Sequence, residues 1–86
     1  MPSKTVIVGS AVGLHARPAT IIAEAAAEYD DEITLAVEGE EPVDAGSSLL
    51  IMTLGAEKGA VVTVESDNAE AVEVIAALVE KDLDAE

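Results

Sequence analysis

The side chains best suited to chemistry are His15 and Arg17, the only histidine and the only arginine of the chain, which lie two positions apart. A histidine ring is partly unprotonated near neutral pH, so one of its nitrogens can act as a nucleophile. A guanidinium holds phosphate oxygens through charge-assisted, often paired hydrogen bonds. The pair therefore indicates attack by His15 on phosphorus, with Arg17 holding a phosphoryl group that the labile N–P bond allows to be passed onward.

The element that must position this pair is a helix predicted from about Ala16 to Glu28. Pro18 suits the first turn, where a missing N–H breaks no hydrogen bond. That turn also presents unpaired N–H groups and the positive end of the helix dipole, which favour a nearby anion by about 0.3–1 kcal/mol. His15 lies where the preceding loop meets this turn. The alternative interpretation is that His15 merely caps the helix.

Other kinds of active site find little support in the sequence. A metal site is not expected, because the chain has no cysteine and no second histidine, and acids are absent around His15. There is no Gly-rich loop for nucleotide phosphates and no nucleophile-elbow motif for Ser-His-Asp catalysis. No cofactor is predicted.

The composition excludes several classes of protein. The chain has 86 residues, half of them apolar, with 18 acids and 4 bases, for a net charge of −14. Binding to nucleic acid or to anionic lipid needs clustered Lys and Arg, so neither partner is expected. No apolar run approaches the ~20 residues of a membrane span, and the N-terminus has no signal-peptide pattern. We expect one domain over residues 1–86, located in the cytoplasm.

The surplus of acids predicts a salty environment. At ordinary ionic strength so high a charge repels itself strongly, whereas at molar salt the Debye length falls to about 3 Å and the repulsion largely disappears. We therefore expect adaptation to a salty cytoplasm; an ordinary acidic protein is the alternative.

The acids are also unevenly distributed. Residues 1–23 and 45–56 contain none, whereas 24–44 and 57–86 contain nine each. Burial explains part of this pattern, but both acid-free windows include polar, turn-like stretches. We expect an acid-poor surface around His15 and the second window, with no acid crowding His15.

The hydrophobic pattern predicts an α+β fold in the order β-α-β-β-α-β-α, with helices on one face of a mostly antiparallel sheet. The predicted strands cover Lys4–Val8, Glu32–Val37, Pro42–Asp44 and Ala60–Glu65, and a short helix runs from Ser47 or Ser48 to about Thr53, closed by Gly55.

Periodicity predicts which helix faces are buried. In the first helix, the residues expected to face the core are Ile21, Ile22, Ala25 and Tyr29. In the last helix, the expected core stripe is Val72, Ile75, Ala76 and Val79, and Asp67 is expected to be the N-cap, in a capping box with Glu70.

The segment Gly13–Thr20, GLHARPAT, resembles the active-site signature of HPr, the histidine-containing phosphocarrier family of the phosphoenolpyruvate-dependent phosphotransferase system. The resemblance covers essentially the whole chain and includes Tyr29–Asp30, Val43–Ala45, Met52–Gly55 and Lys58–Ala60. It implies an open-faced β-sandwich: a four-stranded antiparallel sheet, order 1-4-2-3, covered on one face by three helices.

The resemblance implies that His15 accepts phosphate on Nδ1 from phosphorylated enzyme I and donates it to a IIA domain for sugar uptake. Arg17 would stabilise the phosphoryl group, Pro18 would shape the helix start, and N–H groups around Ala16 and Arg17 would receive phosphate oxygens. The chain would be a monomeric phosphoryl carrier rather than a stand-alone enzyme.

The resemblance also implies that the short middle helix supplies the apolar part of a docking surface for partners. Its candidate residues are Leu49, Leu50 and Met52, and Thr20 and Ser48 complete the predicted docking set. Which of the apolar residues face outward does not follow from the sequence.

Ser47 matches a regulatory serine found in some relatives. However, Gly46 replaces the lysine that precedes that serine, and Ser48 replaces the large apolar residue that follows it. A plain helix cap is therefore preferred over regulatory phosphorylation of Ser47, and the lost apolar residue thins the docking surface.

The sequence is also compatible with other functions. The phosphate could pass to a dihydroxyacetone kinase or a regulatory branch rather than to a sugar permease. The chain could also be a binding module that transfers no phosphate, although such a module needs no phosphorylatable histidine. A small enzyme is disfavoured, since the sequence offers one catalytic pair and no evident pocket.

Overall fold

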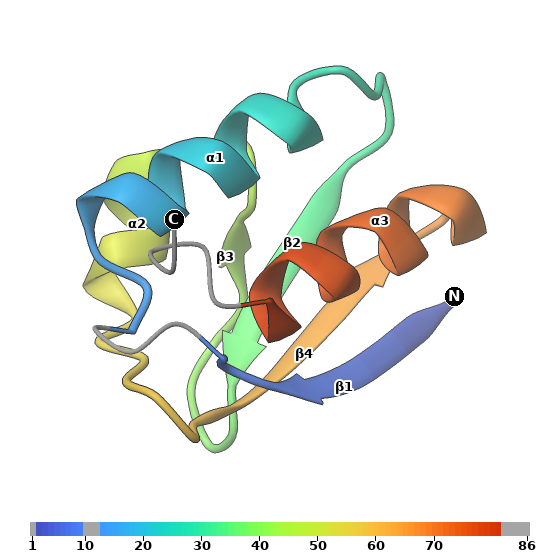
Figure 1. The fold of residues 1–86 in the computed structure, drawn as a ribbon. Helices are drawn as coiled ribbons and strands as arrows, with labels where there is room; N and C mark the ends of the chain where they lie inside the picture. Colours follow the sequence, from blue (N-terminus) through green and yellow to red (C-terminus); the bar gives the residue numbers. More distant parts are fainter. Residues whose placement is uncertain (1, 10–12, 82–86) are drawn as a thin grey trace.

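The computed structural model describes residues 2–9 and 13–81. Its four strands form one antiparallel sheet in the order β1-β4-β2-β3, and its helices lie on one face of that sheet (Figure 1). The elements are β1 (Ser3–Ile7), α1 (Ala16–Ala26), β2 (Ile33–Val37), β3 (Val43–Asp44), α2 (Ser48–Thr53), β4 (Val61–Ser66) and α3 (Ala69–Glu80).

The predicted fold class is confirmed, as is the strand order implied by the resemblance. Every predicted boundary lies within two residues of the observed one. Of the loop expected before the first helix, residues 10–12 lie outside the described part of the chain.

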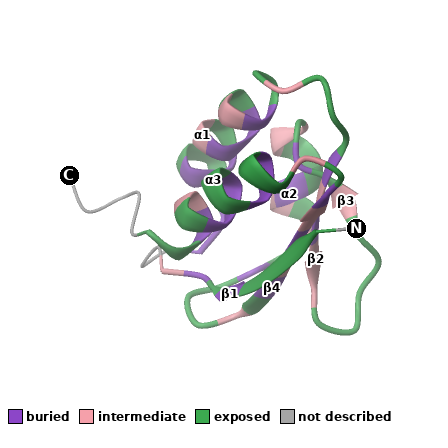
Figure 2. Ribbon diagram, turned by 90° about the vertical axis from the view of Figure 1, so that its right-hand side faces the viewer, coloured by how far each residue is buried: buried purple, intermediate pink, exposed green. Residues whose placement is uncertain are grey.

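Alternating burial along the strands shows which face of the sheet packs against the helices. Val62 and Val64 of β4 point into the core, where they lie opposite Val6 of β1 and Leu35 of β2 in the ladder. Residues between them face away from the helices, because successive side chains of a strand point to opposite faces. Figure 2 shows the buried residues on the sides of the helices that face the sheet.

The buried face of α1 differs in part from the prediction. Ile22 lies at the centre of the core, but Ile21, Ala25 and Tyr29 are only partly buried and pack against its margin. The remaining buried positions of this helix are small or cyclic: Pro18, Ala19, Ala23 and Ala26. The predicted buried face included the larger apolar residues and therefore lay too close to Tyr29. Alanines occupy the inner face instead, and they let the helix approach the sheet closely.

The core stripe of α3 is confirmed, but its predicted cap is wrong. Val72, Ile75, Ala76 and Val79 are buried, as expected. The N-cap, however, is Asn68 rather than Asp67: the Asn68 Oδ1 atom accepts from the N–H groups of Glu70 at 3.0 Å and Ala71 at 3.2 Å.

The amide of Asn68 performs two tasks that a carboxylate cannot combine. While its Oδ1 atom caps α3, its Nδ2 atom donates to the carboxylate of Asp31 at 2.9 Å, in the connection before β2. Its backbone N–H donates to the Oγ atom of the buried Ser66 at 3.1 Å. The start of α3 is thereby tied to a neighbouring connection.

We predict that Asn68→Asp lowers the free energy of unfolding by about 1 kcal/mol at low salt, because the new carboxylate keeps the cap but repels Asp31. Denaturant titrations at low and molar salt measure this, and the loss should shrink as salt screens the repulsion. The control is the swapped pair Asp31→Asn with Asn68→Asp, which restores the donor and acceptor. If the swapped pair is no more stable than the single variant, this account of Asn68 is wrong.

Against the net charge of −14, one favourable charge contact of the described residues joins β1 to α3. The Nζ atom of Lys4 on β1 lies 3.1 Å from the Glu73 carboxylate on α3, but both side chains are substantially exposed, so the pair contributes little. Acids outnumber bases by 18 to 4, and mutual repulsion therefore opposes folding at low salt.

We predict that raising KCl from about 0.1 M to about 2 M increases the melting temperature by about 10 °C, because screening removes this repulsion. Thermal melts followed by circular dichroism test the expectation. The control variant has glutamine in place of Glu38, Glu40 and Glu41 in the exposed β2–β3 turn. Its melting temperature should rise less with salt than that of the wild-type chain. A melting temperature independent of salt in both proteins contradicts the prediction.

Candidate functional site

His15 is the N-cap residue of α1, and its imidazole is free of the capping task. Its backbone is extended (φ −86°, ψ −163°), and its side chain makes no capping hydrogen bond. The His15 carbonyl accepts from the Ala19 N–H at 2.8 Å, which closes the first turn of the helix. The ring is exposed, so the helix-cap alternative does not describe what its side chain does.

Buried neighbours hold this exposed segment in place. Leu14 is 3% exposed, and the Pro18 side chain is fully buried, whereas His15, Ala16 and Arg17 between them are exposed. The backbone N–H of Leu14 donates to the carbonyl of a residue beyond α2, Ala56, at 2.9 Å. The reactive residues thus project from a stretch anchored in the core at both ends.

The first turn of α1 is equipped for an anion. It contains no acid, and within the described residues no carboxylate pairs with the Arg17 guanidinium. Pro18, at the third helical position, has no N–H, so the unpaired donors of this turn are the amides of Ala16 and Arg17. Two amides, a free guanidinium and an imidazole therefore belong to one short segment.

Helix α2 packs against α1 and presents its two leucines to solvent. Leu49 is 71% exposed and Leu50 is 41% exposed, while Ile51 is fully buried. Leu49 and Leu50 are thus the outward apolar residues that the sequence left undetermined. The predicted docking residue Met52 is only partly buried and packs on the core margin.

The polar members of the predicted docking set belong to the two helices that pack together, α1 and α2. Thr20 is exposed on α1, one turn after Ala16, and Ser48 is half-buried at the start of α2. Ser47 is the N-cap of α2, and its Oγ atom accepts from the Leu50 N–H at 3.3 Å. Ser47 therefore caps α2, and its regulatory phosphorylation is not tested by this contact.

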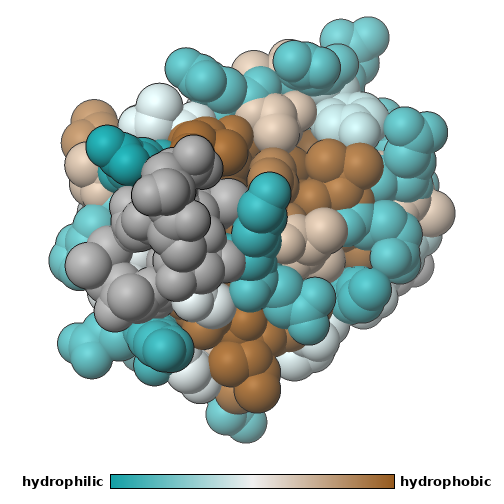
Figure 3. Space-filling model, viewed as in Figure 1, coloured by the Kyte–Doolittle hydropathy of each residue, from teal (hydrophilic) through white to brown (hydrophobic). Residues whose placement is uncertain are grey.

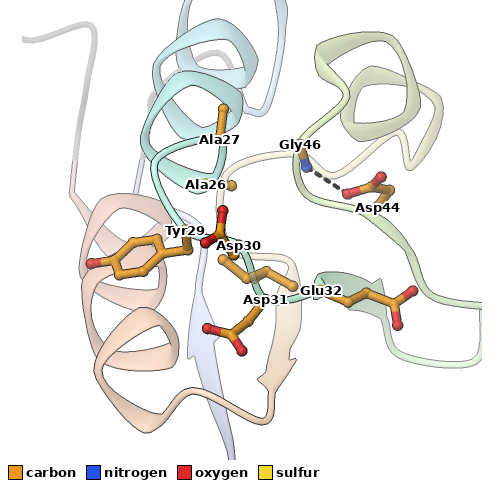
Figure 4. Close-up of a pocket in the computed structure, with 9 residues that line it drawn as sticks. Ala26, Ala27, Tyr29, Asp30, Asp31, Glu32, Asp44 and Gly46 are labelled. Atoms are coloured by element: carbon orange, nitrogen blue, oxygen red, sulfur yellow. Dashed lines mark hydrogen bonds between the residues drawn. The ribbon is translucent and has the colours of Figure 1, made fainter.

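Four acidic residues lie together at the opposite end of α1. A pocket of about 310 Å³ lies there, and its lining residues include Asp30, Asp31 and Glu32, from the α1–β2 connection, and Asp44, from the end of β3 (Figure 4). Asp44 also accepts from the Gly46 N–H at 2.8 Å. Four carboxylates make this pocket unsuitable for phosphate, and an α-helix of this length keeps it roughly 16 Å from His15.

The described segments next to His15 carry few acids, with one neighbour to note; Asp82, Asp84 and Glu86, which the expectation also covers, lie outside the described residues. Residues 45–56, which include α2, contain no acid, but the backbone of Glu57 lies against Gly13. Figure 3 shows hydrophobic patches separated by hydrophilic side chains on the face that it draws. Within residues 2–9 and 13–81, no cluster of histidine, cysteine or acidic side chains could hold a metal ion.

Comparison with known proteins identifies the fold and the signature. Residues 2–81 match the family described as "PTS HPr component phosphorylation site". The chain is also 42% identical, over 67 residues, to the phosphocarrier protein HPr of Streptomyces coelicolor, covering 78% of this chain and 72% of that protein. The chain belongs to the HPr family. It is accordingly a phosphocarrier of the phosphotransferase system.

Solved HPr structures share this architecture. The HPr of Bacillus anthracis is 32% identical, with a TM-score of 0.82, over 90% of this chain and 94% of that one. HPr-C-His of Thermoanaerobacter tengcongensis is 29% identical, with a TM-score of 0.88, over 100% of this chain and 99% of that one.

The helices between residues 2 and 81 lack the length and apolarity that crossing a membrane requires.

The residues that support the HPr signature from behind do not stand out in the local sequence pattern. Leu14 and Ala56 are buried and joined by a backbone hydrogen bond, and Ile51 anchors α2 beneath its exposed leucines. One signal was available for Leu14: a large apolar side chain in an otherwise loop-like segment is typical of an anchor. Nothing in the sequence links Leu14 to Ala56.

Proposed function

We propose that this HPr-family chain carries a phosphoryl group on His15, taking it from phosphorylated enzyme I and passing it to IIA domains during sugar uptake. The observation that carries the proposal is the exposed imidazole at the start of α1, beside Arg17 and free of acids in the first turn. We further propose that the chain works as a cytoplasmic monomer, with residues 1–86 forming one domain.

In the proposed step, unprotonated Nδ1 of His15 attacks the phosphorus of the donor's phosphoryl group in line. The new N–P bond forms as the bond to the donor breaks, and the electron pair of that bond leaves with the donor atom. The second transfer repeats this step, with His15 as the leaving group and a side chain of the IIA domain as the nucleophile. Phosphoryl transfer of this kind depends mainly on positioning and on electrostatic stabilisation.

The residues around His15 have complementary roles in this proposal. Arg17 stabilises the charge on the phosphoryl oxygens during both transfers, and its guanidinium is available because no described carboxylate pairs with it. The amides of Ala16 and Arg17 receive oxygens at the helix start. Pro18 holds the first turn in place from within the core.

The proposed docking surface consists of Thr20, Ser48, Leu49, Leu50 and Met52. Leu49 and Leu50 offer its most exposed apolar side chains. A carrier that meets several partners in turn needs modest, transient interfaces, and a small apolar surface without acids suits that need. In high salt, where long-range steering is screened, these short-range contacts matter more.

We predict that phosphoenolpyruvate and a cognate enzyme I place an acid-labile phosphate on the wild-type chain, and that His15→Ala abolishes it. The measurement is incorporation of radiolabelled phosphate, with folding of the variant checked by circular dichroism. Equal labelling of His15→Ala would remove His15 from the mechanism. Failure of the folded wild-type chain to take up phosphate would favour a binding module that transfers none.

We predict that Leu49→Ala raises the KM for phosphotransfer from enzyme I about fivefold with little change in kcat, because an exposed interface side chain is truncated. The matched control is Ile7→Ala, which truncates a side chain 56% exposed on β1, on the face of the sheet away from the helices. Equal effects of the two substitutions would contradict a docking role for α2.

A further inference from the structure

The loop that leads into His15 is pressed against the corner that follows α2. The Leu14 N–H donates to the Ala56 carbonyl at 2.9 Å, and Gly13, directly before it, lies against the backbone of Ala56 and Glu57. Leu14 and Ala56 are 3% and 5% exposed, so water does not compete for this contact. The contact joins two segments more than 40 residues apart in the chain.

Gly13 has no room for a side chain. A Cβ atom there would overlap the Ala56 carbonyl oxygen and would lie 2.9 Å from the Glu57 Cα atom, both of them backbone atoms that cannot rotate away. Gly13 also has a φ of +77°, a region that other residues rarely adopt. The obstructed oxygen is the same one that accepts from Leu14, so a side chain at Gly13 would push apart the groups that the hydrogen bond joins.

This contact connects the reactive residue to the docking helix. On one side, Leu14 is followed directly by His15, whose carbonyl is fixed by the Ala19 N–H at 2.8 Å. On the other side, Ala56 follows α2 by three residues, and α2 carries the exposed Leu49 and Leu50. The contact of Gly13 and Leu14 with Ala56 thus joins the segment before His15 to the segment after α2, in addition to the direct packing of α1 against α2.

We infer that Gly13 is a positioning residue for phosphotransfer: its lack of a side chain lets the Ala56 carbonyl hold the Leu14 amide, which keeps His15 in register with the partner-docking face of α2. The inference rests on the function proposed above. A partner bound to α2 presents its phosphorus at a fixed place, and His15 must reach it in line. A misplacement of about 1 Å in such a reaction can cost on the order of 100-fold in rate.

The test compares Gly13→Ala with Gly39→Ala as phosphate acceptors from enzyme I and phosphoenolpyruvate. Gly39, in the β2–β3 turn, has a φ of +86° but no atom within 4 Å of a built Cβ, so it reproduces the backbone strain without the overlap. At a temperature where both variants are folded, we expect Gly13→Ala to lower kcat about tenfold or more at nearly unchanged KM. Gly39→Ala should retain the wild-type kcat.

A second variant covers the case in which Gly13→Ala does not fold. Replacing the Leu14 amide by an ester, through nonsense suppression with the α-hydroxy acid, deletes the hydrogen bond to Ala56 without adding an atom. The control is an ester at Ala45, whose buried N–H donates to the Ile33 carbonyl, also at 2.9 Å. We expect the Leu14 ester to lower kcat severalfold and the Ala45 ester to affect stability alone.

The outcomes separate this inference from the proposed function. If the wild-type chain takes up no phosphate, the proposed function fails. If it is labelled but folded Gly13→Ala keeps kcat within about twofold, the positioning role is rejected and the proposed function stands. A rise in KM alone, or an equal loss of kcat in Gly39→Ala, also rejects the positioning role, because neither result follows from a displaced imidazole.

Discussion

Everything in the site depends on the anchoring of one short segment at both ends. Leu14 and Pro18 are buried in the core, and His15, Ala16 and Arg17 between them are therefore held at the surface without being covered. A nucleophile and a guanidinium are useful only if they are both exposed and immobile, since positioning supplies most of the catalysis in phosphoryl transfer. The protein obtains both properties because the flanking residues, rather than the exposed ones between them, pack into the core.

The distribution of charge follows from the same site. In the proposed function a phosphoryl group brings negative charge to the start of α1, so acids placed there would oppose it. The chain keeps its 18 acids out of that turn and out of α2, and four of them line the pocket at the far end of α1. The large net charge and the proposed phosphate site are compatible because neither the first turn of α1 nor α2 contains an acid.

Helix α2, the proposed docking helix, depends on the tertiary structure. It has six residues, far fewer than an isolated helix needs in water. Burial of Ile51, the Ser47 cap and packing against α1 hold it in place, and these contacts leave Leu49 and Leu50 facing outward. The exposed apolar surface of α2, proposed above for docking, therefore results from how the helix is anchored.

The sequence by itself determined the order of elements, the α+β class, the core stripe of α3 and the candidate pair His15 and Arg17, because periodicity and residue chemistry are local properties. The family resemblance added the strand order, which local patterns do not contain. Only the tertiary structure decided which α2 residues face outward, that Asn68 rather than Asp67 caps α3, and that Ala56 holds Leu14. Each of these depends on a neighbour distant in the chain, such as Asp31 for Asn68, and no spacing of residues specifies such a partner.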